Sequence, residues 1–306
     1  MKEVLRVTNL PLPLYARGKV RDTYKLNDDL LLMIGTDRVS TFDVVHPTGI
    51  PNKGKILTQL SDFWFSIQEI KNVVKNHFVE LVDEKWLEKN NLRDHKELIG
   101  RSMVVKKAKR VDVECVVRGY ITGSAWKDYL DQSGPEQGAT ICGIKFPPGL
   151  KESEKLSTPF FTPTTKALSG HDQNITVGDL VKILGKKLAD ELIEKSTKLY
   201  QVASNYALKK GSIIIADTKF EFGFLEGNLV LIDEIFTPDS SRFWDAGDYE
   251  VGRAQNPLDK QHVRNYGIKI GWDRKPPAPE LPKEIVEATQ AKYLDVFRRL
   301  TGSDPI

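Results

Sequence analysis

An acidic, alternating segment in the last third of the chain carries the residues with the clearest potential for chemistry. Asp217, Lys219 and Glu221 alternate in the sequence with phenylalanines at positions 220, 222 and 224. Because successive side chains of a β-strand point to opposite faces, the phenylalanines are expected to face a core and the three charged side chains to share the other face. On that face Lys219 either neutralises the acids structurally or reaches a phosphate group.

A second strand, ending in Asp233 and Glu234, follows a turn at residues 226–228. We expect a three-residue loop to place Glu221 opposite Asp233, and a two-residue loop to place it opposite Glu234. Either pairing brings two carboxylates to a Cβ separation of about 5 Å, which is destabilising unless a cation lies between them. Mg²⁺ is held by one or two carboxylates together with substrate phosphates, so the hairpin predicts a magnesium site on Glu221 and Asp233. The alternative is an exposed hairpin whose acids are solvated.

Two further segments have the composition of anion-binding sites. The loop from Thr237 to Arg242 carries hydroxyls, a carboxylate and a guanidinium. Near the N-terminus, the sequence Ala-Arg-Gly-Lys-Val-Arg-Asp at 16–22 places three cations around one glycine, which lets the backbone approach an anion closely. This segment is not a P-loop, because the second glycine and the Lys-Ser/Thr pair are missing. A solvated basic turn is the alternative.

A strand-to-helix junction and a long loop complete the candidates. Ser124 is predicted to cap a helix that begins at Ala125, and Arg118 could supply a counter-charge for a phosphate at that helix N-terminus. An ordinary cap is the alternative. Residues 134–176 are rich in Pro, Gly, Ser and Thr and show no sustained period, so we expect an irregular, functional segment. Within it, His171 lies beside Asp172, whereas none of the five histidines forms a zinc pattern.

The elements that must position these residues follow from hydrophobic periodicity. We predict strands at Val20–Leu26 and Leu30–Gly35, paired across residues 27–29, and further strands at 102–107, 113–118 and 213–216. A helix is predicted over 56–70. Thr176 is expected to cap a helix that stops at Gly185, a long helix follows to Gly211, and Pro282 opens a last helix that ends at Gly302.

Length and composition limit the classes of protein that remain. The 306 residues are enough for two domains or one large one, and the net charge of +3 does not by itself indicate nucleic acid. Cys115 and Cys142 do not make a disulfide framework or a metal site. The start of the chain lacks the apolar core of a signal peptide, and no apolar run approaches the roughly 20 residues of a membrane span. We therefore expect a cytoplasmic protein that binds neither nucleic acid nor membranes.

Taken together, the segments resemble a known family. The matching motifs are Ala-Arg-Gly-Lys-Val-Arg-Asp at 16–22, Thr-Asp-Arg-Val-Ser-Thr-Phe-Asp at 36–43, Glu-Cys-Val-Val-Arg-Gly-Tyr-Ile-Thr-Gly-Ser-Ala-Trp at 114–126, Phe-Thr-Pro-Thr-Thr-Lys at 161–166, Ala-Asp-Thr-Lys-Phe-Glu-Phe-Gly at 216–223 and Asp-Glu-Ile-Phe-Thr-Pro-Asp-Ser-Ser-Arg-Phe-Trp at 233–244. In this order they resemble SAICAR synthetase (phosphoribosylaminoimidazole-succinocarboxamide synthase), a ligase of purine biosynthesis, over nearly the whole chain. The length is similar to that of the longer, yeast-type members.

The resemblance implies a fold and a reaction. The fold would be α+β, with a β-rich N-terminal portion resembling a kinase small lobe, an ATP-grasp-like α+β C-terminal portion, and ATP in the cleft between them. We expect the corresponding domains at residues 1–112 and 113–306. The implied reaction is ligation of L-aspartate to the carboxylate of the aminoimidazole ribonucleotide CAIR, with ATP and Mg²⁺, giving SAICAR, ADP and phosphate.

The resemblance also implies roles for single residues. The residues matching the ATP site are Arg17, Gly18, Lys19, Val20 and Arg21, with Glu114 towards the adenosine end. Those matching the ribonucleotide site are Asp43, Arg118, Ser124 and Arg242. Glu221 and Asp233 match the Mg²⁺ ligands, and Lys219, Asp217 and the loop acid Asp172 match groups near the reacting atoms.

The CAIR carboxylate is a poor electrophile that ATP can activate as an acyl phosphate, which the aspartate amine displaces. A tetrahedral phosphate intermediate is the alternative. The protein would contribute positioning and charge neutralisation, as in other phosphoryl transfers. No residue stands out as a general base for the amine.

Two other function classes are weighed against this one. A kinase-like phosphotransferase would need the pattern His-Arg-Asp-x-x-x-x-Asn, which the sequence lacks. A nucleotide-sensing or RNA-binding protein is disfavoured by the small net charge and by the lack of an aromatic-rich, RNP-like strand.

Overall fold

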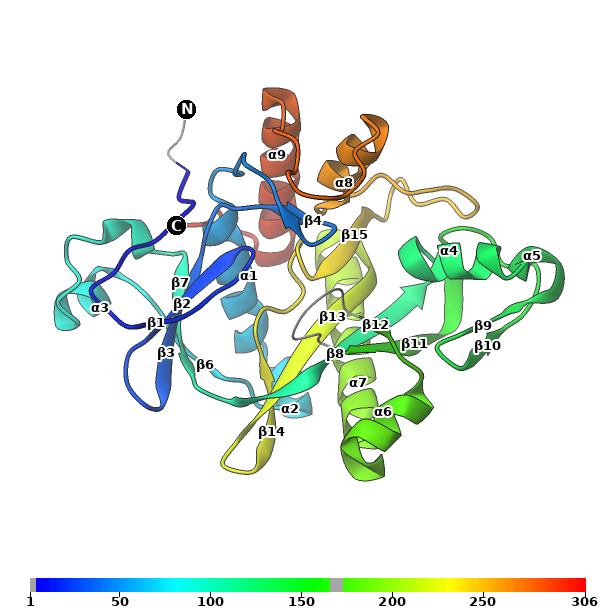
Figure 1. The fold of residues 1–306 in the computed structure, drawn as a ribbon, viewed down its shortest axis with the longest axis horizontal. Coiled ribbons are helices and arrows are strands. Elements are labelled where there is room, and N and C mark those ends of the chain that lie inside the picture. The colour runs from blue at the N-terminus through cyan, green and yellow to red at the C-terminus, as the bar shows by residue number, and fades with distance from the viewer. Residues whose placement is uncertain (1–3, 166–172) are drawn as a thin grey trace.

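The computed structural model describes residues 4–165 and 173–306. Its described part contains two large antiparallel sheets, one built from the N-terminal strands at the left of Figure 1 and the other in the centre, and two two-stranded sheets. Helices pack against both large sheets, so the expected α+β class is confirmed. None of the described helices is long and apolar enough to cross a membrane.

The first sheet has five strands in the order β1-β2-β3-β7-β6. Their bounds are Leu14–Arg17 (β1), Arg21–Lys25 (β2), Leu30–Gly35 (β3), Phe78–Leu81 (β6) and Ser102–Lys106 (β7). The predicted hairpin of β2 and β3 is confirmed. The Asn27 side chain accepts hydrogen bonds from the N–H groups of Asp29 (2.9 Å) and Leu30 (2.8 Å), an Asx turn that reverses the chain.

Short elements connect these strands. They are β4 (Ser40–Thr41), β5 (Val44–Val45), α1 (Lys53–Ser66), α2 (Gln68–Val73), α3 (Glu84–Lys89) and a 3-10 turn at Lys96–Leu98. The prediction of one helix over 56–70 is therefore wrong in extent. Ile67 has extended backbone angles, and the Ser66 hydroxyl donates to the Phe63 carbonyl (2.7 Å) in competition with the helical ladder.

The second sheet has six strands, in the order β12-β11-β8-β13-β14, with β15 also paired to β13. The bounds are Lys109–Tyr120 (β8), Lys155–Thr165 (β11), Gln173–Asn174 (β12), Ile213–Leu225 (β13), Asn228–Ile232 (β14) and Ser241–Asp245 (β15). One edge of β13 pairs with β8. The other edge is shared, since β15 pairs with residues 213–218 and β14 with residues 221–225. Residues 233–240 connect β14 to β15. This connection rejoins the sheet at Ser240, whose carbonyl accepts a hydrogen bond from the Lys219 N–H (2.9 Å).

The expectation of an irregular segment over 134–176 is wrong for the part that the structure describes, 134–165 and 173–176. This stretch holds α5 (Gly134–Gln137), the hairpin of β9 (Ala139–Ile141) and β10 (Ile144–Phe146), and the eleven-residue strand β11. Pro159 and Pro163 hide that strand in the sequence. The sheet tolerates them because β11 bulges between Lys155 and Phe160, and because only the two residues of β12 pair with its outer edge.

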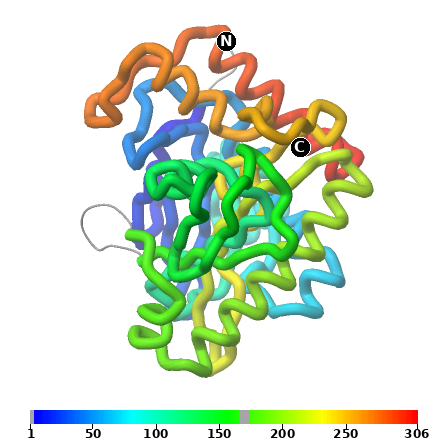
Figure 2. The backbone as a smooth tube through the Cα atoms, turned by 90° about the vertical axis from the view of Figure 1, so that its right-hand side faces the viewer, coloured from blue at the N-terminus to red at the C-terminus, as the bar shows by residue number. Residues whose placement is uncertain are grey.

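The predicted C-terminal helices are confirmed at their ends. Thr176 caps α6 (Val177–Leu184), its hydroxyl accepting from the Asp179 N–H at 3.0 Å. Helix α7 (Lys186–Gly211) follows, and α9 (Lys283–Thr301) begins after Pro282 and ends at Gly302. Two shorter helices, α4 (Gly123–Asp131) and α8 (Gln261–Lys269), complete the described elements. Figure 2 shows α8 and α9 running along one end of the molecule, where Val263 and Leu281 pack against Val39 and Ile50.

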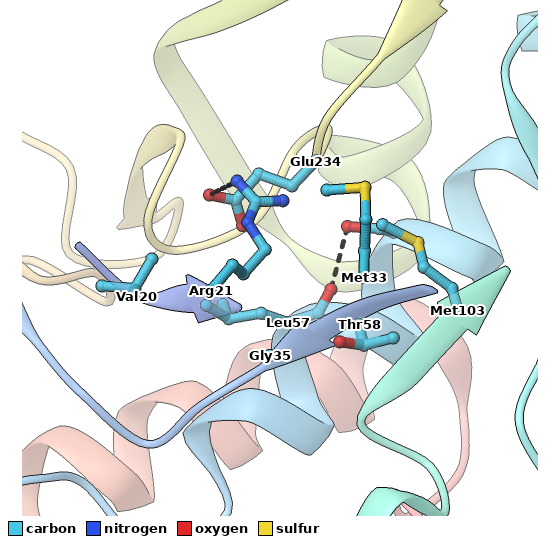
Figure 3. A pocket seen from close by; sticks show the side chains of 9 residues that line it. Val20, Arg21, Met33, Gly35, Leu57, Thr58, Met103 and Glu234 are labelled. Carbon is cyan, nitrogen blue, oxygen red and sulfur yellow. Dashed lines mark hydrogen bonds and ion pairs between the residues drawn. The ribbon is translucent and has the colours of Figure 1, made fainter. Parts of the chain in front are cut away.

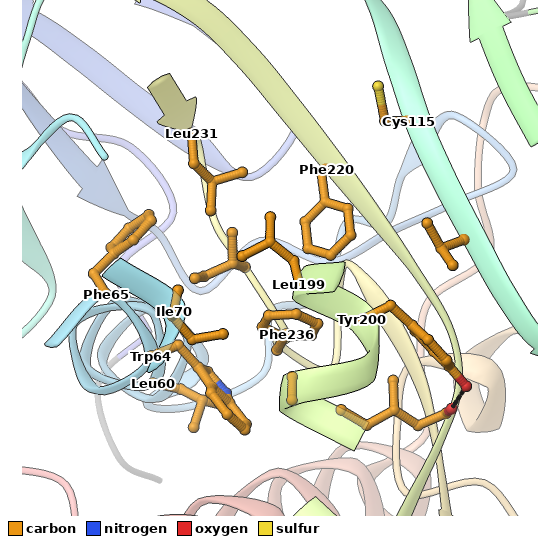
Figure 4. Close-up of a cluster of buried hydrophobic side chains, with 14 of the residues drawn as sticks. Leu60, Trp64, Phe65, Ile70, Cys115, Leu199, Tyr200, Phe220, Leu231 and Phe236 are labelled. Atoms are coloured by element: carbon orange, nitrogen blue, oxygen red, sulfur yellow. Dashed lines mark hydrogen bonds between the residues drawn. The ribbon is translucent and has the colours of Figure 1, made fainter. Parts of the chain in front are cut away.

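The main hydrophobic core joins the N-terminal helices to the second sheet. Figure 4 shows Trp64 of α1, Leu199 and Tyr200 of α7, Phe220 of β13 and Phe236 in one buried cluster. The alternation predicted for β13 is confirmed, since Phe220 and Phe222 are fully buried in this core. The charged residues of β13 must therefore meet on its opposite face.

Candidate active site

On that opposite face, a lysine lies between two carboxylates of neighbouring strands. Glu221 of β13 pairs in register with Glu114 of β8. Lys219 Nζ lies 2.8 Å from Glu114 Oε1 and 2.6 Å from Glu221 Oε1. Burial by itself lowers the pKa of Lys219, but Glu221, Glu114 and Asp233 outweigh it and raise the pKa well above its usual range. The ammonium therefore stays charged, and Lys219 does not serve as a base.

The predicted hairpin register is wrong. The turn has two residues, Glu226 and Gly227, both with positive φ (50° and 78°), as a type I′ turn requires. Leu225 therefore pairs with Asn228, and Glu221 lies opposite Ile232, not opposite Asp233 or Glu234. The acid that faces Glu221 across the ladder is Glu114, on the other edge of β13.

Asp233 reaches the same cluster through a tertiary contact. It follows the end of β14 with a left-handed backbone (φ 69°), and its carboxylate lies 2.7 Å from the Arg21 guanidinium of β2. Glu234 lies 3.4 Å from the same guanidinium and accepts a hydrogen bond from the Thr237 hydroxyl (2.8 Å). Burial lowers the pKa of Arg21, but Asp233, Glu234 and Glu221 outweigh it and raise the pKa. Arg21 thus joins the first sheet to the acidic face of the second.

A second cluster is built around Asp217. Arg118 of β8 and Arg242 of β15 are both opposite Asp217 in the sheet, one on each side. Asp217 Oδ2 accepts from Arg118 Nη1 at 2.9 Å and also pairs with Arg242. Arg118 further donates to the hydroxyls of Ser124 and Thr162, each at 3.1 Å. Two guanidiniums and two hydroxyls around one carboxylate leave positive charge for an anionic group.

The predicted helix cap at Ser124 is wrong. Helix α4 begins at Gly123, and Thr122 occupies the N-cap position without a side-chain cap. Ser124 lies in the first turn, which frees its hydroxyl for Arg118. Gly123 is required here, because it has φ 59° and a Cβ atom at this position would lie 2.4 Å from the Arg242 guanidinium.

The basic loop between β1 and β2 is held by an arginine that the sequence-based site did not include. Arg38 donates to the carbonyls of Gly18 and Lys19, each at 3.0 Å, and pairs with Asp22 at 2.7 Å. The sequence feature that could have pointed to Arg38 is its position inside the family motif at 36–43. Lys19 pairs with Asp43, which has a left-handed backbone (φ 65°).

The two remaining members of this loop take different positions. Arg17 lies 3.4 Å from Asp22 and donates to the Thr8 carbonyl at 3.0 Å. Val20 instead lines a narrow pocket beneath the loop. Of the predicted site residues, Asp172 lies outside the described part of the chain.

These motifs and their geometry agree with what the comparisons with known proteins found. The family model described as SAICAR synthetase matches residues 14–279. The chain belongs to the SAICAR synthetase family. It is 53% identical, over 99% of its length and 100% of the relative's, to the phosphoribosylaminoimidazole-succinocarboxamide synthase of Thermodesulfovibrio yellowstonii. With the synthase of the same name from Geobacter sulfurreducens it shares 47% identity over 99% of each chain.

Solved structures agree in fold. The SAICAR synthase of Saccharomyces cerevisiae, described as complexed with SAICAR, superposes with a TM-score of 0.85 at 41% identity, over 98% of this chain and 99% of that one. A SAICAR synthetase described as a complex with ADP has a TM-score of 0.67 at 26% identity and covers 95% of this chain and 99% of that one. The expectation of a longer, yeast-type member of this ligase family is confirmed.

The structure has a narrow pocket next to the candidate site and an open groove away from it. The pocket in Figure 3 lies between Arg21 and Glu234 on one side and Met33, Leu57 and Met103 on the other. Its volume of about 10 Å³ is roughly that of one water molecule, so it is a packing gap and not a substrate site. The groove, of about 340 Å³, lies between α4, the β9–β10 hairpin and the start of α6. Of the predicted site residues that the structure describes, none lines it.

Sequence reasoning missed a histidine beside the acidic cluster. His77 is buried, its Nε2 lies 3.4 Å from the Asp233 carbonyl, and burial lowers its pKa to about 4. A neutral imidazole therefore packs behind Asp233. Within residues 4–165 and 173–306, no three His, Cys, Asp or Glu side chains form a group that would hold a metal without further ligands.

Proposed function

We propose that this chain ligates L-aspartate to the carboxylate of CAIR at the expense of ATP, giving SAICAR, ADP and phosphate in the cytoplasm. The observation that carries the proposal is the adjacency of the two clusters on β13, where Asp217 with its arginines stands two residues from Lys219 and its carboxylates. One cluster suits a phosphate ester and the other a metal–nucleotide. The names of the relatives, and the SAICAR and ADP that two of the solved structures contain, support this reading.

The charges of the acidic cluster fit a divalent cation. Glu114, Glu221, Asp233 and Glu234 are neighbours of two cations, Lys219 and Arg21. Carboxylates gathered in a partly buried site offer the oxygen ligands that a divalent cation prefers. We assign Mg²⁺ to Glu221 and Asp233, with substrate phosphates as further ligands, a pattern usual for this ion. When bound, the ion would neutralise phosphate oxygens as charge develops on them.

The basic loop would lie over the ATP phosphates. Arg38 fixes the loop by binding the carbonyls of Gly18 and Lys19. The Gly18 N–H donates to the Arg21 carbonyl (2.8 Å) and Lys19 pairs with Asp43, so a bound phosphate would draw the Lys19 side chain from Asp43. We assign Arg17, Val20 and Arg21 to the same ATP site, and Glu114 to its adenosine end. On this proposal residues 1–112 cover the nucleotide and residues 113–306 hold the other ligands.

The second cluster would hold the ribonucleotide. Arg118, Ser124 and Arg242 would bind the phosphate of CAIR, with Asp217 keeping the two guanidiniums in place and Asp43 contacting the same substrate. A CAIR carboxylate oxygen would then attack the γ-phosphorus of ATP and ADP would leave. The aspartate amine would next attack the acyl carbon, lose a proton and release phosphate. Lys19 and the charged Lys219 would lie near the transferred group and stabilise its charge.

One assay tests the proposal. Purified protein is given CAIR, ATP and Mg²⁺, with and without L-aspartate, while ADP release and SAICAR formation are followed. We expect SAICAR and ADP in equal amounts, and only with aspartate present. Phosphorylation of a hydroxyl compound without aspartate would instead indicate a kinase, and the absence of any turnover would indicate a nucleotide sensor. Either result would refute the ligase assignment.

A further inference from the structure

Two cations at the start of helix α8 lack a carboxylate partner. Among residues 4–165 and 173–306, no Asp or Glu oxygen lies within 4.0 Å of a side-chain nitrogen of Lys260 or Arg264. Arg264 Nη1 donates to the neutral Gln261 Oε1, at 3.1 Å. The cations of the acidic cluster differ in this respect. Arg21 lies 2.7 Å from the Asp233 carboxylate, and Lys219 lies 2.8 Å and 2.6 Å from its two carboxylate partners.

Backbone hydrogen bonds place the start of α8 between the two clusters. The Lys260 N–H donates to the Pro238 carbonyl (3.3 Å), in the loop that follows Asp233 and Glu234. The neighbouring Asp259 accepts from the N–H of Phe243 (2.9 Å), the residue after Arg242 on β15. Lys260 is thus fixed beside the loop that follows the acidic cluster, and α8 beside β15, which carries Arg242 of the cluster around Asp217.

The two cations share one side of the helix. The Arg264 N–H donates to the Lys260 carbonyl (3.2 Å), so the residues are one helical turn apart and their side chains lie on the same face. Both are only partly exposed. Burial lowers the pKa of Lys260 to about 8, against the attraction of Asp239 and with repulsion from Arg264. Burial and Arg242 likewise lower the pKa of Arg264.

The carboxylates nearest to the two cations are already engaged by other groups. Asp259 accepts hydrogen bonds from the N–H groups of Phe243 (2.9 Å) and Gln261 (2.7 Å) and forms no ion pair with Arg264. Asp239 pairs with the buried Lys53 at 2.7 Å, and Asp217 pairs with Arg118 at 2.9 Å. Two positive charges therefore lie close together in a partly buried place, and neither has an ion-pair partner among the described residues. Such an arrangement is costly in the free protein and is relieved when an anion with two charged groups binds.

We propose that Lys260 and Arg264 bind the carboxylates of the amino-acid substrate and select a short dicarboxylic amine. This inference rests on the proposed function, in which L-aspartate must approach the CAIR carboxylate between the two clusters. The ribonucleotide phosphate already has Arg118, Ser124 and Arg242. Two separate cations one helical turn apart suit the two carboxylates of one small molecule.

Steady-state kinetics of Lys260→Met and Arg264→Met test the proposal. We expect each change to raise the KM for L-aspartate by about tenfold to a hundredfold, the effect of losing one charge-assisted hydrogen bond, while the KM values for CAIR and ATP change by less than about twofold. Arg264→Lys should recover part of the loss because it keeps the charge. Lys269→Met, at the exposed far end of the same helix, is the matched control and should behave as the unaltered protein.

A second readout separates binding from a structural role. The ratio of kcat/KM for L-aspartate to that for L-asparagine should fall at least about tenfold in both Met variants, since asparagine lacks one of the two charges. Loss of stability alone would lower both values together. If a Met variant does not fold, Lys260→Gln and Arg264→Gln take its place.

The outcomes are distinct. A raised KM for CAIR with an unchanged KM for aspartate would assign the pair to the ribonucleotide and overturn the proposal, as would unchanged values for both. Failure of the unaltered protein to form SAICAR would instead refute the proposed function itself.

Discussion

At the scale of single residues, the candidate site consists of carboxylates that share a smaller number of cations. Lys219 bridges Glu114 and Glu221, and Arg21 bridges Asp233 and Glu234. A divalent ion bound by Glu221 and Asp233 would leave Lys219 paired with Glu114. Arg21 would keep its pairing with Glu234. Binding of the metal would therefore exchange ion pairs without leaving a buried charge unpaired, which would be costly.

Replacing Glu221 with Gln should lower kcat about a hundredfold or more, because the amide keeps the hydrogen bond to Lys219 but not the charge that the metal needs. The melting temperature should change by only a few degrees. Turnover and thermal unfolding measure the two effects. Glu226→Gln, in the exposed turn of the same hairpin, is the control and should keep full activity. Near-normal turnover of Glu221→Gln at ordinary Mg²⁺ would rule out the metal assignment.

Removal of the metal should act through the same residues. EDTA is expected to abolish SAICAR formation, and added Mg²⁺ to restore it. In the presence of a non-hydrolysable ATP analogue, Mg²⁺ should raise the melting temperature of the unaltered protein, because a ligand that binds only the native state stabilises it. In Asp233→Asn this rise should largely disappear. An equal rise in both proteins would show that the ion binds elsewhere.

At the scale of elements, the cluster around Asp217 depends on how closely β15 and the start of α4 approach each other. Gly123 makes this approach possible, because its missing Cβ leaves room for the Arg242 guanidinium. The pairing of β8, β13 and β15 sets the rest, since it places Arg118 and Arg242 on either side of Asp217. Displacement of either element would separate the two guanidiniums that lie around Asp217.

Gly123→Ala should therefore raise the KM for CAIR about tenfold or more, as Arg242→Ala should, and leave the KM for ATP nearly unchanged. The added methyl group would displace Arg242, and the positive φ adds strain. Gly178→Ala in α6 is the control, because that glycine has no positive φ and a Cβ atom there meets only Thr176, at 3.5 Å. An unaltered KM for CAIR in Gly123→Ala would refute the role of this close approach.

At the scale of the whole molecule, a buried ion pair joins three parts of the chain. Lys53 of α1 is fully buried and lies 2.7 Å from Asp239, in the loop after β14, and Tyr293 of α9 donates to the same carboxylate at 2.9 Å. Burial raises the pKa of Asp239, but Lys53 and Lys260 outweigh it and lower the pKa to about 2. This contact fixes the loop that follows Asp233 and Glu234 to helices from both ends of the sequence.

Lys53→Met should reduce the free energy of unfolding by about 3–5 kcal/mol at neutral pH, because it leaves a buried carboxylate without its cation. In the unaltered protein the folded pKa of Asp239 lies below the unfolded value of about 3.9, so this stabilisation is present above pH 4 and is lost as the pH falls towards 2. The difference between the two proteins should therefore narrow in acid. Urea unfolding at neutral and acid pH measures it, with the exposed Lys71→Met as control. A constant difference would contradict this origin.

The sequence alone was enough for features that depend on local periodicity and on short motifs. Alternation along β13 separated Phe220 from Glu221, because side chains of a strand alternate wherever the strand lies. The Thr176 cap and the glycines after α6 and α9 set helix ends through local backbone chemistry. The order and content of the motifs were specific enough by themselves to indicate the SAICAR synthetase family. Proline concealed β11, because its cost in a strand depends on which edge is paired.

Only the tertiary structure decided which groups meet. Glu221 faces Glu114, from a strand far earlier in the chain, and Asp233 reaches Arg21 of the other sheet. Pairing between distant strands depends on the register of the whole sheet, and a two-residue turn in place of three moved every partner of β14 by one position. The contacts of Arg38, and those of Lys260 and Arg264 that we propose for the amino-acid substrate, also depend on the fold, since a cation's role depends on which carboxylates and backbone groups lie beside it. The acidic face of β13 was therefore a property of the sequence, and its partners were a property of the fold.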